Sequence, residues 1–408
     1  MPATAPISAT TAQEGPLPLG ARYPALDGVR GLAVCLLLLA HLLVLKPADG
    51  ATANVVASTI RMSWICIDIF FCLSAFLITG ILLQTRDSKD YFRSFYGRRF
   101  LRIFPLYYLL LFIIFVVVPK LSIYGYGNHF WINGRESPLW YFGFAENVRL
   151  AVTGDYAHRL LSVAWTLSVE EQFYVVWPFL VYFTRPERLA RVCLILIGVA
   201  VAVRFGLYAI EASPKVVHTF TFSRMDGIAF GSYLAIRCRD RAFVNATINR
   251  LPQLFFAFAA ALVLGAVFVR LFQPSTKFTE FVYSQFFQTL GYTISVGFAG
   301  VLVMSAAYGH PGGIAQRFWC SKPLQVLGTY SFGLYLLHEP VIYLLRRHHV
   351  FNVTDFADRP LLAQLLNYTV IPSVTLVVAM ASWHFFEAPI LRLKRLFPYR
   401  RDAAKAAP

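Results

Sequence analysis

Long apolar segments recur along the whole chain and constrain its fold more than any other feature. Ten of them approach or reach the length of a helix that crosses a bilayer. They lie at about residues 27–46, 62–84, 104–119, 163–183, 191–210, 216–236, 252–272, 286–308, 323–345 and 365–390. The chain is 14% charged, whereas soluble domains carry about 25% charged residues. We therefore predict an all-α, polytopic membrane helical bundle with about ten transmembrane helices.

Basic residues gather in alternate loops between these segments. The groups are Arg86 to Arg102, Arg185 to Arg191, Arg237 to Arg241, and a tail from Arg392 to Arg401. Basic loops stay in the cytoplasm, so we predict that both termini are cytoplasmic and that the protein is a multi-pass protein of the cell inner (plasma) membrane. Arg346 and Arg347 go against this trend. The net charge of +16 reflects this topology, and we expect no nucleic-acid partner.

The ends of the chain differ from its apolar middle. We predict a flexible N-terminal lead over 1–20, an integral membrane domain over 21–392 and a basic cytoplasmic tail over 393–408, with the first apolar helix uncleaved. The six cysteines form no metal-type pair, and we predict no metal site. The aromatic loop at about 120–162 is either an acceptor-binding cap or an interfacial belt.

The first apolar segment contains two ionisable residues at a suggestive spacing. Arg30 and His41 are eleven positions apart, which places them on one helix face and about 16 Å apart along the axis. A cation near the membrane surface and an imidazole deep above it are costly in an apolar helix. They indicate a functional pair.

Further ionisable residues fall within other apolar segments, at similar depths when counted from the segment ends. Such residues are rare in membranes and face a bundle interior or a wet cavity. These residues could form one functional layer, or they could make structural contacts between helices, and both interpretations stay open. Together with His41, the residues are Asp68, Glu170, Glu171, Arg204, Arg224, Asp226 and His338.

An arginine cluster lies between the second and third segments, in YFRSFYGRRFLRIFPLYY. Arg98, Arg99 and Arg102 are either positive-inside flanking residues or a phosphate clamp, because guanidinium groups match phosphate oxygens well. We expect Pro105 to open the next helix. A donor with phosphates at one end and a reactive group on a long arm would fit the separation of Arg30 and His41, and acetyl-CoA has that shape.

Seven motifs in order resemble acyltransferase family 3, a family of integral membrane proteins that includes bacterial O-acetyltransferases of O-antigen, other surface glycans and Nod factors. The resemblance covers about 22–392. The motifs are LDGVRGLAV with His41, IDIFFCLSAFLIT, FYGRRFLRIFPLYY, WTLSVEEQFYVVWP, SRMDGIAFG, LGTYSFGLYLLHEP and FFEAPILRL. The resemblance implies that Arg30 and His41 are essential and that Arg98, Arg99 and Arg102 serve the acyl donor.

Two features distinguish this chain from the usual family pattern: one residue in a motif, and the expected domain composition. The family usually has Ser-Gly-Phe where this chain has Ser74-Ala75-Phe76, which leaves the size of the acyl group open. We expect the membrane unit to work without a fused extracytoplasmic SGNH-type esterase domain, either alone or with a separate partner.

These features predict transfer of an acyl group, most simply acetyl, from cytoplasmic acyl-CoA to a hydroxyl of a glycan or lipid-linked saccharide at the outer side. His41 is the expected general base, with Asp68 or Glu171 orienting its ring; an acyl-histidine intermediate is also possible. We expect supporting or substrate-binding roles for a further set, and a homo-oligomer is possible. The set is Ser74, Glu170, Arg224, Asp226, His338 and Glu387.

Three other functions stay open at this point. The acceptor could be the hydroxyl of a small molecule, such as a macrolide. A proton-coupled secondary transporter also needs intramembrane histidines and carboxylates, but transporters usually show internal repeats and paired broken helices, which we do not find. A structural membrane scaffold would not require so many buried charges.

Overall fold

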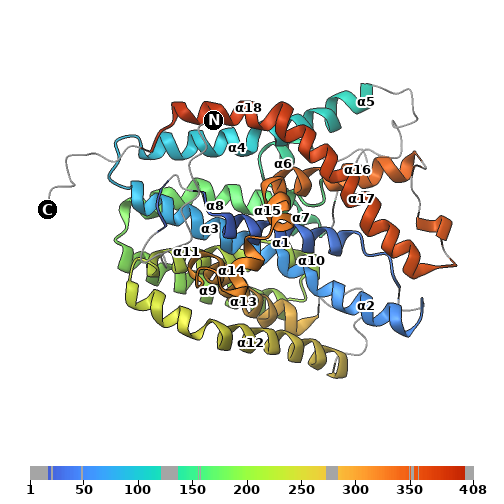
Figure 1. The fold of residues 1–408 in the computed structure, drawn as a ribbon, viewed down its shortest axis with the longest axis horizontal. Helices are drawn as coiled ribbons and strands as arrows, with labels where there is room; N and C mark the ends of the chain where they lie inside the picture. The colour runs from blue at the N-terminus through green and yellow to red at the C-terminus, as the bar shows by residue number, and fades with distance from the viewer. Residues whose placement is uncertain are drawn as a thin grey trace.

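The computed structural model describes residues 17–19, 22–46, 49–120, 137–154, 156, 158–272, 284–348, 350, 353–356 and 358–399. The regular structure in these ranges is helical (Figure 1). The predicted lead over 1–20 and tail over 393–408 therefore lie largely outside the described residues, as does the first part of the aromatic loop, 121–136.

The α-helices follow one another along the chain and differ widely in length. Their bounds are α1 Pro24–His41, α2 Ala51–Arg61, α3 Cys66–Thr85, α4 Tyr91–Phe112, α5 Val118–Lys120, α6 Leu139–Phe142, α7 Glu146–Thr153, α8 Ala164–Phe183, α9 Pro186–Ala209, α10 Pro214–Thr219, α11 Thr221–Arg237, α12 Arg241–Phe272, α13 Tyr292–Tyr308, α14 Ile314–Trp319, α15 Lys322–Thr329, α16 Ser331–Arg347, α17 Pro360–Ser382 and α18 Ala388–Leu391. Short 3₁₀ turns lie at η2 Met62–Ile65, η5 Arg159–Leu161, η8 Val353–Phe356 and η10 Arg392–Leu396. Single π turns lie at η3 Ile113–Val117, η7 Phe287–Gly291 and η9 Trp383–Glu387.

Within the described residues, 7 helical segments are long and apolar enough to cross a membrane. They are Pro24–His41, Val55–Thr85, Tyr91–Lys120, Pro186–Ala209, Arg241–Val269, Phe287–Tyr308 and Pro360–Leu396. The other three predicted spans correspond to α8, α11 and α16. Of these, α11 and α16 have only 17 residues each, and the polar run from Glu170 to Gln172 lowers the hydropathy of α8.

These three helices carry several of the buried ionisable residues. Most of α11 is buried, and it packs mainly against α3 and α9. A helix that is surrounded by other helices does not need a lipid-facing apolar surface. The structure therefore shows a polytopic helical membrane protein, while the number of crossings beyond the seven remains a prediction.

The arginine cluster lies on a helix and not before one. The helix α4 begins at Tyr91 and continues through Pro105, so the prediction that Pro105 opens a helix is wrong. A proline inside a helix removes one hydrogen bond and is tolerated when neighbouring helices pack around it. As a result, Arg98, Arg99 and Arg102 are held at fixed positions along one rigid element.

The first helix lies in the middle of the bundle (Figure 1) and packs against α3, α13, α15 and α16. Its approach to α15 depends on glycine. A Cβ atom on Gly31 would overlap the carbonyl group of Leu324, and one on Gly328 would overlap that of Asp27. The motif LDGVRG therefore lets two helix backbones touch, which fixes the rotation of α1 and the direction of Arg30 and His41.

Candidate functional site

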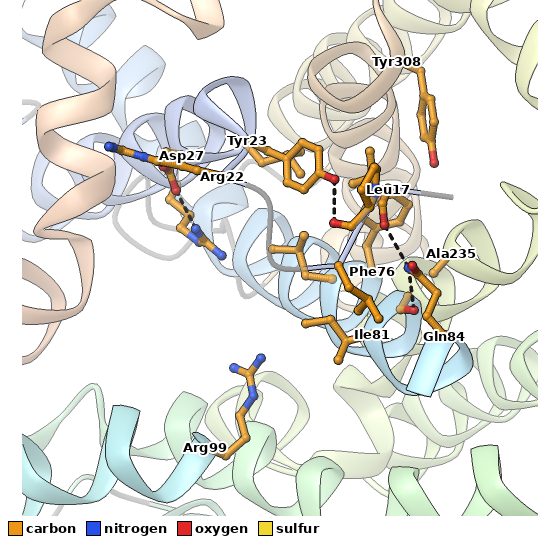
Figure 2. Close-up of a pocket in the computed structure, with 16 residues that line it drawn as sticks. Leu17, Arg22, Tyr23, Asp27, Phe76, Ile81, Gln84, Arg99, Ala235 and Tyr308 are labelled. Atoms are coloured by element: carbon orange, nitrogen blue, oxygen red, sulfur yellow. Dashed lines mark hydrogen bonds and ion pairs between the residues drawn. The ribbon is translucent and has the colours of Figure 1, made fainter. Parts of the chain in front are cut away.

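A cavity of about 390 Å³ lies at the N-terminal end of α1 (Figure 2). Its walls come from the start of α1, the end of α3, the middle of α4 and the ends of α11 and α13, with residues 17–19 across one side. In the predicted topology all these helix ends face the cytoplasm. The polar side chains that line it are Arg22, Tyr23, Asp27, Arg30, Gln84, Arg99 and Tyr308.

The cavity has more positive than negative charge. One carboxylate, that of Asp27, is shared by two arginines: Arg30 donates to it at 2.7 Å and Arg22 at 3.1 Å. Arg99 points into the cavity from α4 (Figure 2). Its guanidinium lies 5.4 Å from the ring centre of Tyr174, and no ion pair to it occurs among the described residues. The surplus of guanidinium groups makes this cavity suited to an anion.

The other two predicted donor-binding arginines make contacts elsewhere. Arg98 donates to the backbone carbonyls of Lys394 and Phe397, at 3.3 and 3.1 Å. Arg102 lies 3.9 Å from a carboxylate oxygen of Glu387, which was predicted as a supporting residue. Sequence reasoning treated the three arginines alike, but only Arg99 contributes to the wall of this cavity.

A set of hydrogen bonds is centred on Tyr174, whose ring lies beside the guanidinium of Arg99. Tyr174 donates to Glu170 at 3.0 Å. Since a tyrosine has one hydroxyl proton, Ser74 must donate in its 2.6 Å contact with Tyr174. The carboxylate of Glu170 also interacts electrostatically with Arg99 and Arg30. The predicted residues Ser74 and Glu170 are therefore adjacent to the cationic cavity, and Glu171 is buried next to them on α8.

The departure from the family motif at Ala75 lies in an apolar environment. Ala75 is buried in a cluster with Phe71, Trp165 and Ile228. The next residue, Phe76, lines the cavity. The extra methyl group thus lies in a buried contact between helices, and Ala75 is not among the described residues that line the cavity.

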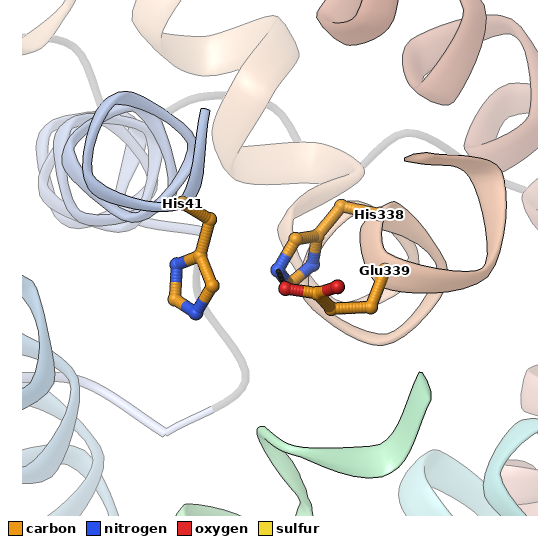
Figure 3. A group of neighbouring side chains, drawn as sticks. All are labelled: His41, His338 and Glu339. Atoms are coloured by element: carbon orange, nitrogen blue, oxygen red, sulfur yellow. Dashed lines mark ion pairs between the residues drawn. The ribbon is translucent and has the colours of Figure 1, made fainter. Parts of the chain in front are cut away.

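The other end of α1 brings two histidines together (Figure 3). The ring centres of His41 and His338 are 4.9 Å apart with the planes inclined at 79°. Glu339 completes the group, with a carboxylate oxygen 4.0 Å from Nε2 of His338. His41 is exposed, whereas His338 is fully buried. By helix rise this group lies about 16 Å from Arg30.

The backbone sets the proton positions on both imidazole rings. Nδ1 of His41 lies 3.0 Å from the carbonyl oxygen of Leu37. Nδ1 of His338 lies 2.7 Å from that of Tyr335. A carbonyl can only accept, so each Nδ1 carries the proton and each neutral ring has its lone pair on Nε2. Both rings are therefore oriented to accept a proton or bind an electrophile at Nε2.

Asp68 lies in a different set of contacts from the one predicted for it. Its two oxygens accept from Arg224 at 2.7 Å and from Ser295 at 2.6 Å. The carboxylate beside the histidines is Glu339, which sequence reasoning overlooked. The sequence feature that could have identified Glu339 is its position directly after His338 in YLLHEP.

The remaining buried charges connect helices. Arg204 and Asp226 form an ion pair of 2.8 Å with both side chains fully buried. The guanidinium of Arg224 lies 3.9 Å from the ring centre of Tyr292. These contacts join α3, α9, α11 and α13. The predicted polar layer is thus divided: four of its charged residues join helices, Glu170 interacts electrostatically with Arg99, and His41 packs against His338.

Comparison with known proteins decides the family. A family model described as "Acyltransferase domain" (Acyl_transf_3) matches residues 23–384. The chain belongs to this acyltransferase family. The match includes Arg30, His41, Arg99 and His338, so both ends of α1 and their partners fall within the family domain.

Curated relatives in this acyltransferase family cover 90% of the chain. The chain is 28% identical over 386 residues to the peptidoglycan O-acetyltransferase OatA of Listeria monocytogenes. It is 29% identical over 394 residues to the putative peptidoglycan O-acetyltransferase YrhL of Bacillus subtilis and 26% identical over 389 residues to the O-acetyltransferase OatA of Staphylococcus aureus. The chain spans about half the length of these relatives, 55% for the first two and 57% for the third. No solved structure matches the chain.

Membership confirms the predicted family and, for the domain, the predicted enzyme class, an acyltransferase. Together with the candidate spans it also confirms a multi-pass protein of the cytoplasmic membrane. The predicted roles of single residues remain predictions.

Proposed function

We propose that the protein transfers an acetyl group from acetyl-CoA in the cytoplasm to a hydroxyl of a cell-envelope glycan, of the peptidoglycan type, at the outer side of the membrane. One observation carries the proposal. The helix α1 joins a cationic cavity that contains Arg30 to a histidine pair that contains His41, about 16 Å away along its axis. The names of the relatives suggest the acceptor class.

The donor end uses charge. Arg99, Arg30 and Arg22 line the cavity, and their guanidinium groups can hold the phosphates of CoA through charge-assisted hydrogen bonds. Arg98, Arg102 and Lys394 add positive charge near this wall, since Lys394 interacts electrostatically with Arg102, Arg99, Arg98 and Arg30. The positive field of the whole cluster would draw the anionic donor to this side.

The pantetheine arm would run from this cavity along α1 towards His41. Nε2 of His41 takes the proton of the acceptor hydroxyl, and the hydroxyl oxygen attacks the thioester carbonyl. The carbon–sulfur bond then breaks, and the thiolate of CoA takes the proton back from the imidazolium. Glu339, next to the histidine pair, would stabilise the imidazolium, a role that the sequence analysis predicted for Asp68 or Glu171.

The proposal includes the topology that the two substrates require. Ten crossings with both termini in the cytoplasm put the cavity on the side of acetyl-CoA and His41 in the outer half of the membrane. The basic residues that line or flank the cavity support this orientation.

The direct test compares glycans from cells with and without the protein. We expect muropeptides or surface glycans to gain the mass of one acetyl group when the protein is expressed, and to lose it with His41→Gln. Membranes supplied with acetyl-labelled CoA should transfer the label to the same glycan. Label that stays out of every glycan and appears in a small-molecule ester would overturn the glycan acceptor.

A further inference from the structure

The group formed by His41, His338 and Glu339 has a second chemical capacity besides proton transfer. Its three potential ligand atoms, one from each side chain, all lie within 4.8 Å of one another (Figure 3). They come from only two elements, the end of α1 and the middle of α16, which pack against each other. Two imidazole nitrogens and one carboxylate oxygen are a ligand set that suits zinc.

The hydrogen bonds of both rings prepare them for a metal. Histidine ligands usually donate their other ring N–H to a backbone carbonyl or a carboxylate, which fixes the tautomer and the ring orientation. Here Nδ1 of His41 and Nδ1 of His338 both donate to backbone carbonyls one helical turn earlier. Each Nε2 therefore keeps its lone pair, and Nε2 of His338 lies 4.0 Å from a carboxylate oxygen of Glu339.

The burial of His338 adds an independent observation. Its side chain is fully buried, and its Nε2 has no hydrogen-bond partner among the described residues. Burying an unpaired polar atom is unfavourable, and a bound cation would satisfy this nitrogen. His41 is exposed, which offers the ion a route to the site.

The geometry requires only a small closure. Zinc ligands at about 2.0–2.1 Å in a tetrahedron lie roughly 3.3 Å from one another, compared with at most 4.8 Å here. Small side-chain rotations would bring the three atoms together. Since the chain would supply three ligands, a fourth position would stay open for water.

We propose that His41, His338 and Glu339 bind a divalent transition-metal ion of the zinc class, and that the bound ion inhibits acyl transfer. The inhibition rests on the proposed function, because the ion takes the same Nε2 lone pair that His41 needs as general base. The ion would thus be a regulator. This site departs from the sequence prediction of no metal, since the two histidines lie almost 300 positions apart.

The test uses the purified full chain in detergent and Co²⁺ as a spectroscopic probe of the zinc site. We expect one Co²⁺ per chain with the visible absorption of a tetrahedral ion, displaced by Zn²⁺ and not by Mg²⁺, which prefers oxygen ligands. His338→Ala and Glu339→Gln should each weaken Co²⁺ binding roughly tenfold or more. Glu339→Gln keeps the size of the side chain, so it still tests the site if His338→Ala does not fold.

His384→Ala is the matched control. The Nδ1 atom of His384 lies 2.8 Å from the carbonyl of Met380, which repeats the ring arrangement of His41 outside the proposed site. This variant should bind Co²⁺ like the wild type. Co²⁺ binding that is absent, or that is the same in the wild type, His338→Ala and Glu339→Gln, would overturn the site.

Acyl transfer is measured separately on the same preparations. We expect Zn²⁺ to inhibit transfer by the wild type. For Glu339→Gln, each rate is divided by the rate of that variant without Zn²⁺, and inhibition should require a higher Zn²⁺ concentration. Full transfer with the site occupied would overturn the inhibition. A chain that binds Co²⁺ through these residues but transfers no acetyl group from acetyl-CoA would refute the proposed function and leave the metal site standing.

Discussion

Arg99 offers the sharpest test of the donor cavity, because its neighbour on α4 provides a matched comparison. Arg99 lines the cavity and has no ion pair among the described residues. Arg98 donates to two backbone carbonyls of the C-terminal segment instead. If the cavity holds the phosphates of CoA, replacing Arg99 should weaken binding far more than replacing Arg98, although the two residues are identical and adjacent.

The magnitude follows from the contact that is lost. A hydrogen bond to a charged group contributes about 1.5–3 kcal/mol, so Arg99→Ala should weaken acetyl-CoA binding roughly tenfold to a hundredfold. Arg99→Lys keeps the charge but loses the forked geometry, and should fall between wild type and alanine. In Arg98→Ala the main loss is the anchoring of residues 394–397, which should appear as reduced thermal stability.

The assay is equilibrium binding of labelled acetyl-CoA to purified protein, with size-exclusion profiles and melting curves for each variant. Arg93→Ala is the control for charge removal, since Arg93 lies on the same helix with 72% of its side chain exposed. Its affinity should stay near the wild-type value. Two results would refute the reasoning: unchanged affinity in a folded Arg99→Ala protein, or an equal loss in Arg98→Ala.

Three further predictions concern the histidine, a buried ion pair and the topology. His41→Gln should lower acyl transfer by about 10²–10⁴-fold while acetyl-CoA binding survives; near-normal turnover in membranes would return His41 to a packing role. Asp68→Asn should destabilise the protein by about 3–5 kcal/mol, because it leaves Arg224 buried without its countercharge, and Asp68→Asn combined with Arg224→Met should melt higher than Asp68→Asn alone. Single cysteines at positions 3 and 405 in a cysteine-free background should react with a membrane-impermeant reagent only after the membrane is opened, and labelling of intact cells at either end would invert the proposed topology.

The sequence by itself determined the class of the protein. Apolar segments about as long as a bilayer is thick allow only helices, because backbone groups in lipid must pair within their own segment. The motifs around Arg30, His41, the arginine cluster and His338 determined the family, since each lies on a contiguous stretch. The number of positions between Arg30 and His41 also determined their distance along the helix axis, because the rise per residue is a local property of a helix.

Only the tertiary structure decided which side chains meet. Arg98, Arg99 and Arg102 look equivalent in the sequence, but the packing of α4 gives them different contacts. Arg98 binds the C-terminal segment, Arg99 lines the cavity and Arg102 lies beside Glu387. Helix rotation depends on close approaches such as that of Gly31 to Leu324, which join residues far apart in the chain. For the same reason the sequence did not show that the carboxylate beside the histidine pair is Glu339, or that Asp68 pairs with Arg224. Distance along a helix can be counted from the sequence, but contact between helices depends on packing.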